Sequence, residues 1–150
     1  MVVHILLKKN ILIDMAKEEK QLLLQDLCAR LPYGVQCEGF YEEDASYKSP
    51  FGSLEKVIDQ MENIEHVGFD DGEIYIVIGG FQCELCDVKP YLRPMSSMTE
   101  EERKEYWDIT SVSNYCAAID WLNVHHFDYR NLVERGLAIA VTEENNPYKE

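Results

Sequence analysis

The segment at residues 88–102 most constrains the fold, because the pattern changes there from strand-like to helical. Pro90 and Pro94 lack a backbone N–H, and each pushes the residue before it towards extended geometry. Thr99 and Glu102 then form a T-x-x-E capping box, in which each side chain accepts a hydrogen bond from the other residue's backbone N–H. The segment therefore predicts the boundary between a sheet and a group of helices.

A helix is predicted before this boundary, over residues 17–30. Its leucines recur at spacings of three and four, which places them on one apolar stripe. The stripe consists of Leu23, Leu24, Leu27 and Leu31. The Pro-Tyr-Gly sequence at 32–34 is typical of a helix end.

Short strands are predicted between this helix and the boundary. The clearest is 73–78, and Gly79 and Gly80 after it favour a tight hairpin, because glycine adopts positive φ without penalty. Residues 81–88 are then expected to return antiparallel to 73–78. Further strands are expected at three places: 35–40, from 51 to 57 or 58, and 64–69.

Three short helices are predicted after the boundary. The first covers 100–108. The second runs from 114 to about 126 and is capped by Ser113. The third covers 129–135, with Asp128 as its cap and Gly136 in the left-handed position that ends many helices.

Strands followed by helices indicate an α+β fold. We expect an N-terminal helix, a small curved antiparallel sheet of four or five short strands and a C-terminal cluster of three short helices. An SH3-like partial barrel is one form that such a sheet could take. The domain is predicted to span 15–140, and 141–150 reads as a polar tail. Residues 1–14 are either an upstream extension, with Met15 as the initiator, or an extra strand, since β-branched residues dominate them.

The charge of the chain restricts its partners. The 150 residues carry a net charge of −14, which disfavours binding to a phosphate backbone, because such binding needs clustered Lys and Arg. The acidic residues indicate a basic partner or simply a solvated surface. No apolar run approaches the ~20 residues of a membrane span, and no secretory signal is visible, so we expect a cytoplasmic protein with reduced thiols and no membrane contact.

Two polar groups could carry chemistry. Cys83 and Cys86 form a C-x-x-C within an expected strand, without the further ligands of a zinc site or the helix N-terminus of a redox pair, so we interpret them as structural. His125 and His126 lie near a helix end, where side chains of adjacent residues diverge, and Asp128 reads as a cap. We therefore predict no catalytic residue, cofactor or metal.

A possible interaction surface is indicated by aromatic and arginine side chains, which are frequent binding hot spots. Tyr91 and Arg93 lie in the extended segment between the two prolines. The interpretation that we favour for these residues is structural: the aromatic side chains pack the helices and the sheet, and Arg93 binds carbonyls or a carboxylate. The candidates are Tyr91, Arg93, Trp107, Trp121, Tyr129 and Arg130.

Three segments, 26–35, 88–102 and 120–138, resemble a group of small proteins encoded by phages and prophages of gut Bacteroidetes. The resemblance covers about 22–138, and its most specific part is the sequence at 88–102. It implies an accessory role for a phage in a bacterial host, and it supports Met15 as the start. The family is of unknown function, so it provides no catalytic residues to transfer to this chain.

The main functional hypothesis is a non-enzymatic module that binds a host or phage protein. A first alternative is a module for single-stranded nucleic acid, in which tyrosines and phenylalanines of the sheet stack on bases. A second is a small metal-dependent hydrolase built on His125, Asp128 and the cysteines. The oligomeric state is left open.

Overall fold

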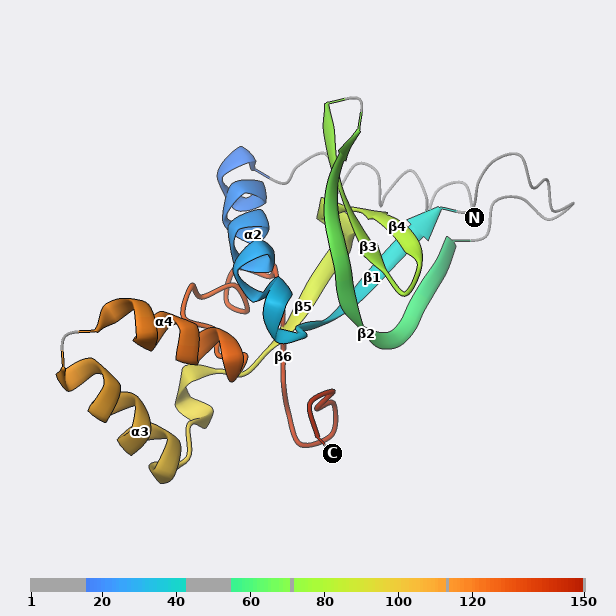
Figure 1. Ribbon diagram of the computed structural model, residues 1–150. Coiled ribbons are helices and arrows are strands. Elements are labelled where there is room, and N and C mark those ends of the chain that lie inside the picture. Colours follow the sequence, from blue (N-terminus) through green and yellow to red (C-terminus); the bar gives the residue numbers. More distant parts are fainter. Residues whose placement is uncertain (1–15, 43–54, 71, 113, 150) are drawn as a thin grey trace, which may run out of the picture.

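The computed structural model describes residues 16–42, 55–70, 72–112 and 114–149. Within these ranges the chain has an α+β fold, as predicted. One helix packs on a curled sheet, and two further helices stand together at one end of the molecule, away from the sheet (Figure 1). Residues 1–14, for which two interpretations were given, and the first residues of the strand expected from 51 lie outside the described residues.

Helix α2 (Lys17–Arg30) covers the range that its leucine spacing predicts. Leu23 and Leu27 are 0% exposed, and burial of a leucine side chain stabilises a fold by about 1.5–3 kcal/mol. The helix tightens into a 3₁₀ turn and ends at Gly34, whose φ of 68° lies in the left-handed region that favours glycine.

Among the described residues, six strands pair in the order β4-β3-β2-β1-β5-β6. Neighbours are antiparallel except β5 and β6, which are parallel. The strands are β1 (Gln36–Glu42), β2 (Glu55–Asp70), β3 (Glu73–Ile78), β4 (Phe81–Glu84), β5 (Val88–Leu92) and β6 (Ile139–Ala140).

Strand β2 divides the array into two small sheets, because its first part pairs with β1 and its last part with β3. The register shifts between Cys37 and Gly39 and again between Ile64 and His66. Such bulges bend a strand and increase its twist. As a result β2 curves strongly (Figure 1) and β4 comes close to β1, although the described strands do not close into a barrel.

Two clusters of apolar side chains stabilise the fold. The larger lies between α2 and the sheet, and the smaller holds the C-terminal helices. The buried members of the larger are Leu23, Leu27, Val35, Cys37, Ile64, Ile76, Ile78, Cys83, Leu85, Val88, Leu92, Leu132, Leu137 and Ala138. Those of the smaller are Trp121, Leu122 and Phe127.

The capping box predicted at the boundary is present. The Glu102 backbone N–H donates to Thr99 Oγ1, and the Thr99 backbone N–H donates to Glu102 Oε1, both over 3.1 Å. Helix α3 (Glu100–Ser111) therefore begins as expected. Helix α4 (Tyr115–Val124) is capped by Asn114, whose Oδ1 accepts from the Ala117 N–H over 3.1 Å. Ser113, the predicted cap, lies outside the described residues.

Two strand predictions differ from the structure. The expected strands at 51–58 and 64–69 are one strand, β2, over the described residues, because its polar middle still pairs through the backbone, as Glu62 does with Cys37. The expected strand at 81–88 is divided by a 3₁₀ turn, η2 (Leu85–Asp87), into β4 and β5. The sheet therefore has six strands among the described residues, where four or five were expected.

The third C-terminal helix, predicted at 129–135, is a series of turns. Asn131 has a φ of 58°, and a left-handed residue interrupts a right-handed helix. Asp128 nevertheless acts as a cap, since its carboxylate accepts from the N–H groups of Leu132 and Val133 over 2.9 and 3.0 Å. Gly136 has the expected positive φ, 75°. Local capping was thus predictable where the helix was not.

Candidate functional site

Helices α3 and α4 form an antiparallel pair, which we call the hairpin (residues 100–124). Several large apolar side chains of the hairpin are open to solvent. We define the hairpin surface as four of them. They are Trp107 (72% exposed), Val112 (73%), Tyr115 (73%) and Ile119 (44%). Val124, at the end of α4, is also exposed.

The inner side of the hairpin is filled by aromatic side chains. Trp121 stacks on Phe127 with ring centroids 5.7 Å apart and planes inclined by 12°. Tyr106 approaches Trp121 from α3 with a centroid distance of 5.6 Å, and Ile109 packs on the same cluster. Each helix therefore has a packed face, and in the part of the chain that the structure describes the hairpin surface remains largely exposed.

Glu102 attaches the hairpin to the end of β5. Its carboxylate accepts two hydrogen bonds from the Arg93 guanidinium, over 2.8 and 2.7 Å, in addition to its role in the capping box. His125 Nδ1 lies 3.8 Å from the same carboxylate. The bonds from Arg93 are the main reason that the pKa of Glu102 falls from 4.5 to about 2. The Arg93 guanidinium also lies 4.1 Å from the centre of the Phe127 ring.

Backbone hydrogen bonds fix the other end of the hairpin. The Arg93 N–H donates to the His126 carbonyl, and the Asp128 N–H donates to the Arg93 carbonyl, both over 2.8 Å. The chain that leaves α4 is thus paired with the chain that leads into α3. Both ends of the hairpin are held, so its outer side chains are presented from a fixed frame.

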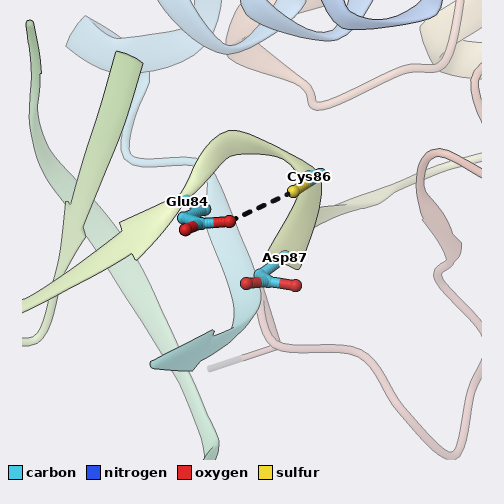
Figure 2. Close-up of side chains that lie close together, drawn as sticks. All are labelled: Glu84, Cys86 and Asp87. Carbon is cyan, nitrogen blue, oxygen red and sulfur yellow. Dashed lines mark hydrogen bonds between the residues drawn. The ribbon is translucent and has the colours of Figure 1, made fainter. Parts of the chain in front are cut away.

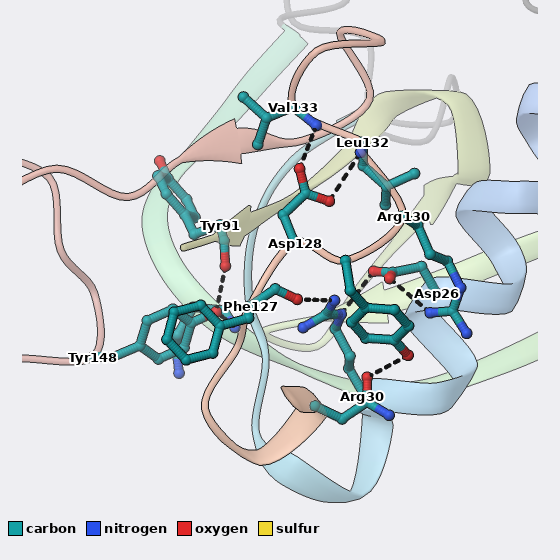
Figure 3. A network of polar contacts seen from close by, with 12 residues as sticks. Asp26, Arg30, Tyr91, Phe127, Asp128, Arg130, Leu132, Val133 and Tyr148 are labelled. Atoms are coloured by element: carbon teal, nitrogen blue, oxygen red, sulfur yellow. Dashed lines mark hydrogen bonds and ion pairs between the residues drawn. The ribbon is translucent and has the colours of Figure 1, made fainter. Parts of the chain in front are cut away.

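A buried ionic network joins α2 to the segment that follows α4 (Figure 3). Asp26 and Arg30, both 0% exposed, pair over 2.8 Å, and Arg130 binds the second oxygen of Asp26 over 2.9 Å. Arg30 also donates to the Phe127 carbonyl. Because a buried charge is costly unless it is paired, this network ties α2 to the turn after α4.

The C-terminal segment docks beside this network. The Tyr148 hydroxyl donates to the Tyr91 carbonyl over 2.7 Å and accepts from the Gln36 N–H over 3.0 Å. Its ring stacks on His126 at a centroid distance of 3.7 Å. Burial is the main cause that lowers the pKa of His126 from 6.5 to about 4, and Arg30 acts in the same direction. Residues that read as a polar tail therefore pack against the domain.

The six candidate interaction residues differ in their environments. Trp107 is exposed, whereas Tyr91 and Trp121 are 9% and 8% exposed. Arg93 pairs with Glu102, and Arg130 pairs with Asp26. Tyr129 is half-buried, and its hydroxyl donates to Asn123 Oδ1 over 2.9 Å. The structure thus brings five of the six into packing or internal polar contacts.

The sequence interpretation missed three residues of the hairpin surface. Tyr115 and Ile119 follow the helical spacing of the buried residues Ala118 and Leu122, so they read as part of one inner face. The signal that could have separated the exposed pair from the buried pair is the width of the apolar face of α4. That face is wider than the area that packing against one neighbouring element can bury. Val112 follows the last residue of α3, and the sequence interpretation assigned it to no helix.

Figure 2 shows a second group, formed by Glu84, Cys86 and Asp87 at the turn between β4 and β5. One ligand atom of each lies within 4.8 Å of the others. The Cys86 thiol donates to the Glu84 carboxylate over 3.7 Å. Burial, with the nearby carboxylates, raises the pKa of Cys86 to about 11, so the thiol is protonated near neutral pH. The group offers a cation two carboxylates but no ready thiolate.

The remaining candidates for chemistry do not converge. Cys83 is buried in the main cluster, and burial raises its pKa to about 11. Both oxygens of Asp128 accept hydrogen bonds from backbone N–H groups, while His125 lies against Glu102.

An open groove of about 580 Å³ follows α2 and is lined by Glu18, Gln21, Leu22, Leu24, Gln25 and Cys28.

Comparison of the chain with protein-family models, with curated proteins and with solved structures gives no match. Among the described residues, no helix combines the length and the apolar character that crossing a membrane requires. The functional interpretation therefore depends on the geometry of this chain.

Proposed function

We propose that this protein is a non-enzymatic interaction module that binds another protein through the hairpin surface. The observation that carries the proposal is the exposure of Trp107, Val112, Tyr115 and Ile119 on one pair of anchored helices. Large apolar side chains that a fold leaves exposed are a frequent feature of binding sites. Tryptophan and tyrosine are also among the residues that contribute most to protein–protein binding.

The attachment of the hairpin supports the same proposal. Glu102 fixes the start of α3 to Arg93, and Phe127 and Trp121 fill the space beneath α4. A surface that is already ordered loses little conformational entropy on binding, which favours affinity. A side chain such as Trp107 can then bury roughly 150–250 Å² in a partner.

We further propose that the partner is a host or phage protein in the cytoplasm of a bacterial cell, and that this chain is an accessory protein of a phage or prophage. The support is the resemblance of 26–35, 88–102 and 120–138 to phage and prophage proteins. The buried network that joins Asp26 to Arg130 connects two of these segments. The resemblance therefore includes residues that hold the hairpin in place.

Site-specific photocrosslinking in the bacterial host tests the proposal. A photoreactive phenylalanine analogue replaces Trp107 in one variant and Ile119 in another. Phe69, which is 71% exposed on β2, is the matched control outside the hairpin. We expect covalent adducts with a second protein from positions 107 and 119 and not from 69. Absence of adducts from both hairpin positions, or the same adducts from position 69, would contradict the proposal.

A further inference from the structure

We infer that the hairpin surface receives a basic segment of the partner, one that carries lysine or arginine together with apolar side chains. The inference rests on the proposed function and specifies the partner's chemistry. It follows from the carboxylates that share one face of α3 with the exposed Val112.

A row of carboxylates runs along one side of α3. Glu101, Glu105 and Asp108 are spaced by four and three residues, which places them on one face of the helix. All three are exposed. In the part of the chain that the structure describes, none of them takes part in an ion pair. These charges are therefore not compensated within the described fold.

The apolar residues continue this row. Val112 follows Asp108 by four residues and so extends the same face to the end of α3. Tyr115 lies at the start of α4, and Ile119 follows one turn later. Val112 thus stands beside the carboxylates, a pattern that matches a partner with both cationic and apolar groups. Trp107 lies on another side of α3, where Arg103 and Lys104 precede it by four and three residues.

The charge balance of the hairpin is acidic. The negative charge of Glu102 is neutralised by Arg93, so Glu102 contributes little to the electrostatic potential outside the hairpin. The hairpin has two basic residues, Arg103 and Lys104, which are outnumbered by the remaining acidic residues. Those acids are Glu100, Glu101, Glu105, Asp108 and Asp120. The net charge of −14 on the whole chain has the same sign and would steer a cationic partner towards it.

The uncompensated carboxylates also weaken the helix that carries them. Like charges four residues apart, such as Glu101 and Glu105, repel one another on a helix. A lysine or arginine from a partner would remove this repulsion, and its aliphatic stem could cover apolar area while the charged end reaches a carboxylate.

A peptide-binding experiment tests the inference on the full chain. The probe is a fluorescent amphipathic peptide of lysine and leucine. Two control peptides of equal length replace lysine by glutamate or leucine by serine. Binding is followed by fluorescence anisotropy at low and at high salt. We expect only the lysine–leucine peptide to bind tightly, with an affinity that falls as salt rises.

Variants locate the binding site. One set neutralises the row (Glu101→Gln, Glu105→Gln, Asp108→Asn), and another removes apolar area (Trp107→Ser, Tyr115→Ser). The matched controls are Glu143→Gln with Glu144→Gln, two exposed acids outside the hairpin, and Phe69→Ser. Each hairpin set should weaken binding by about tenfold or more, and the controls by less than about twofold. Far-ultraviolet circular dichroism checks that every variant is folded.

Three results would overturn the inference. The first is equal loss of binding in the control and hairpin variants, which indicates non-specific attraction to an acidic protein. The second is equal binding of the lysine–serine peptide. The third is self-association that Trp107→Ser abolishes, seen by sedimentation, because a second copy then occupies the surface. If crosslinks form from position 107 while the peptide fails, the proposed function stands and only the partner's chemistry is wrong.

Discussion

Helix α2 and the hairpin differ in how far their apolar side chains are buried. The buried face of α2 includes two leucines and the ionic pair Asp26–Arg30, all 0% exposed. In contrast, α3 has no residue in the buried class, and Trp107 on it is 72% exposed. The apolar face of α2 is thus buried by the rest of the fold, whereas α3 leaves a large apolar side chain exposed to solvent. The difference concerns α3, because α4 buries Trp121 and Leu122 in the smaller cluster. Under our proposal, α3 serves binding more than stability.

The largest effect should come from Asp26. The variant Asp26→Ala leaves Arg30 buried without its carboxylate and removes the partner of Arg130. Loss of one partner of a buried pair costs about 3–5 kcal/mol, so we expect urea denaturation to give a free energy of unfolding lower by that amount. Exposed Asp120→Ala is the control and should change it by less than about 0.5 kcal/mol. A small effect at Asp26 would remove the contrast between the two regions.

The attachment of the hairpin should respond to Glu102→Gln. This change removes the charge that Arg93 binds with two hydrogen bonds, and we expect a loss of about 1–2 kcal/mol because the pair is partly exposed. Hydrogen exchange should accelerate in α3 and α4 before it does in α2. Glu105→Gln, on the same helix but without an ion pair among the described residues, is the control. Equal acceleration in α2 would mean that the hairpin is not a separate unit.

The pH dependence of stability should reveal His126. Its pKa is about 4 in the folded protein and 6.5 in the unfolded chain, so the unfolded state binds more protons between these values. The contribution of His126 is therefore complete above pH 6.5 and is lost as the pH falls towards 4, by about 1 kcal/mol after allowance for partial exposure. His126→Asn, which tolerates the φ of 61°, should flatten this part of the profile. An unchanged profile would contradict the buried environment.

The smallest effect on stability should come from Trp107, and the two tryptophans make a matched pair. Trp107→Ser removes an exposed side chain and should change the free energy of unfolding by less than about 0.5 kcal/mol. Trp121→Ser removes the ring that stacks on Phe127 and should cost about 3–5 kcal/mol. Similar losses in both, measured by urea denaturation, would show that Trp107 serves the fold.

Features set by neighbouring residues were predictable from the sequence. The capping box joins Thr99 and Glu102, three residues apart, and the positive φ of Gly80 completes a two-residue turn. Both depend on local backbone geometry, which the residue types dictate. For the same reason the ends of α2 and α3 were close to those expected.

Features set by distant residues were not predictable. Asp26 binds Arg130, which lies 104 residues later in the chain. The sequence around either residue contains no signal that predicts this contact. The sequence also could not separate Trp107 from Trp121, because exposure depends on which side of the hairpin faces Phe127. Asn131 interrupts the expected third helix with a left-handed φ, and asparagine is a residue type that adopts both left-handed and right-handed backbone conformations.

The yield of crosslinks from position 107 relative to position 69 tests most directly whether the hairpin surface is a binding site. Both side chains are exposed to the same degree, 72% and 71%, so general accessibility is matched. We predict a discrete adduct with a second protein from position 107 and none from position 69. Equal adducts from the two positions, or none from position 107, would contradict the account.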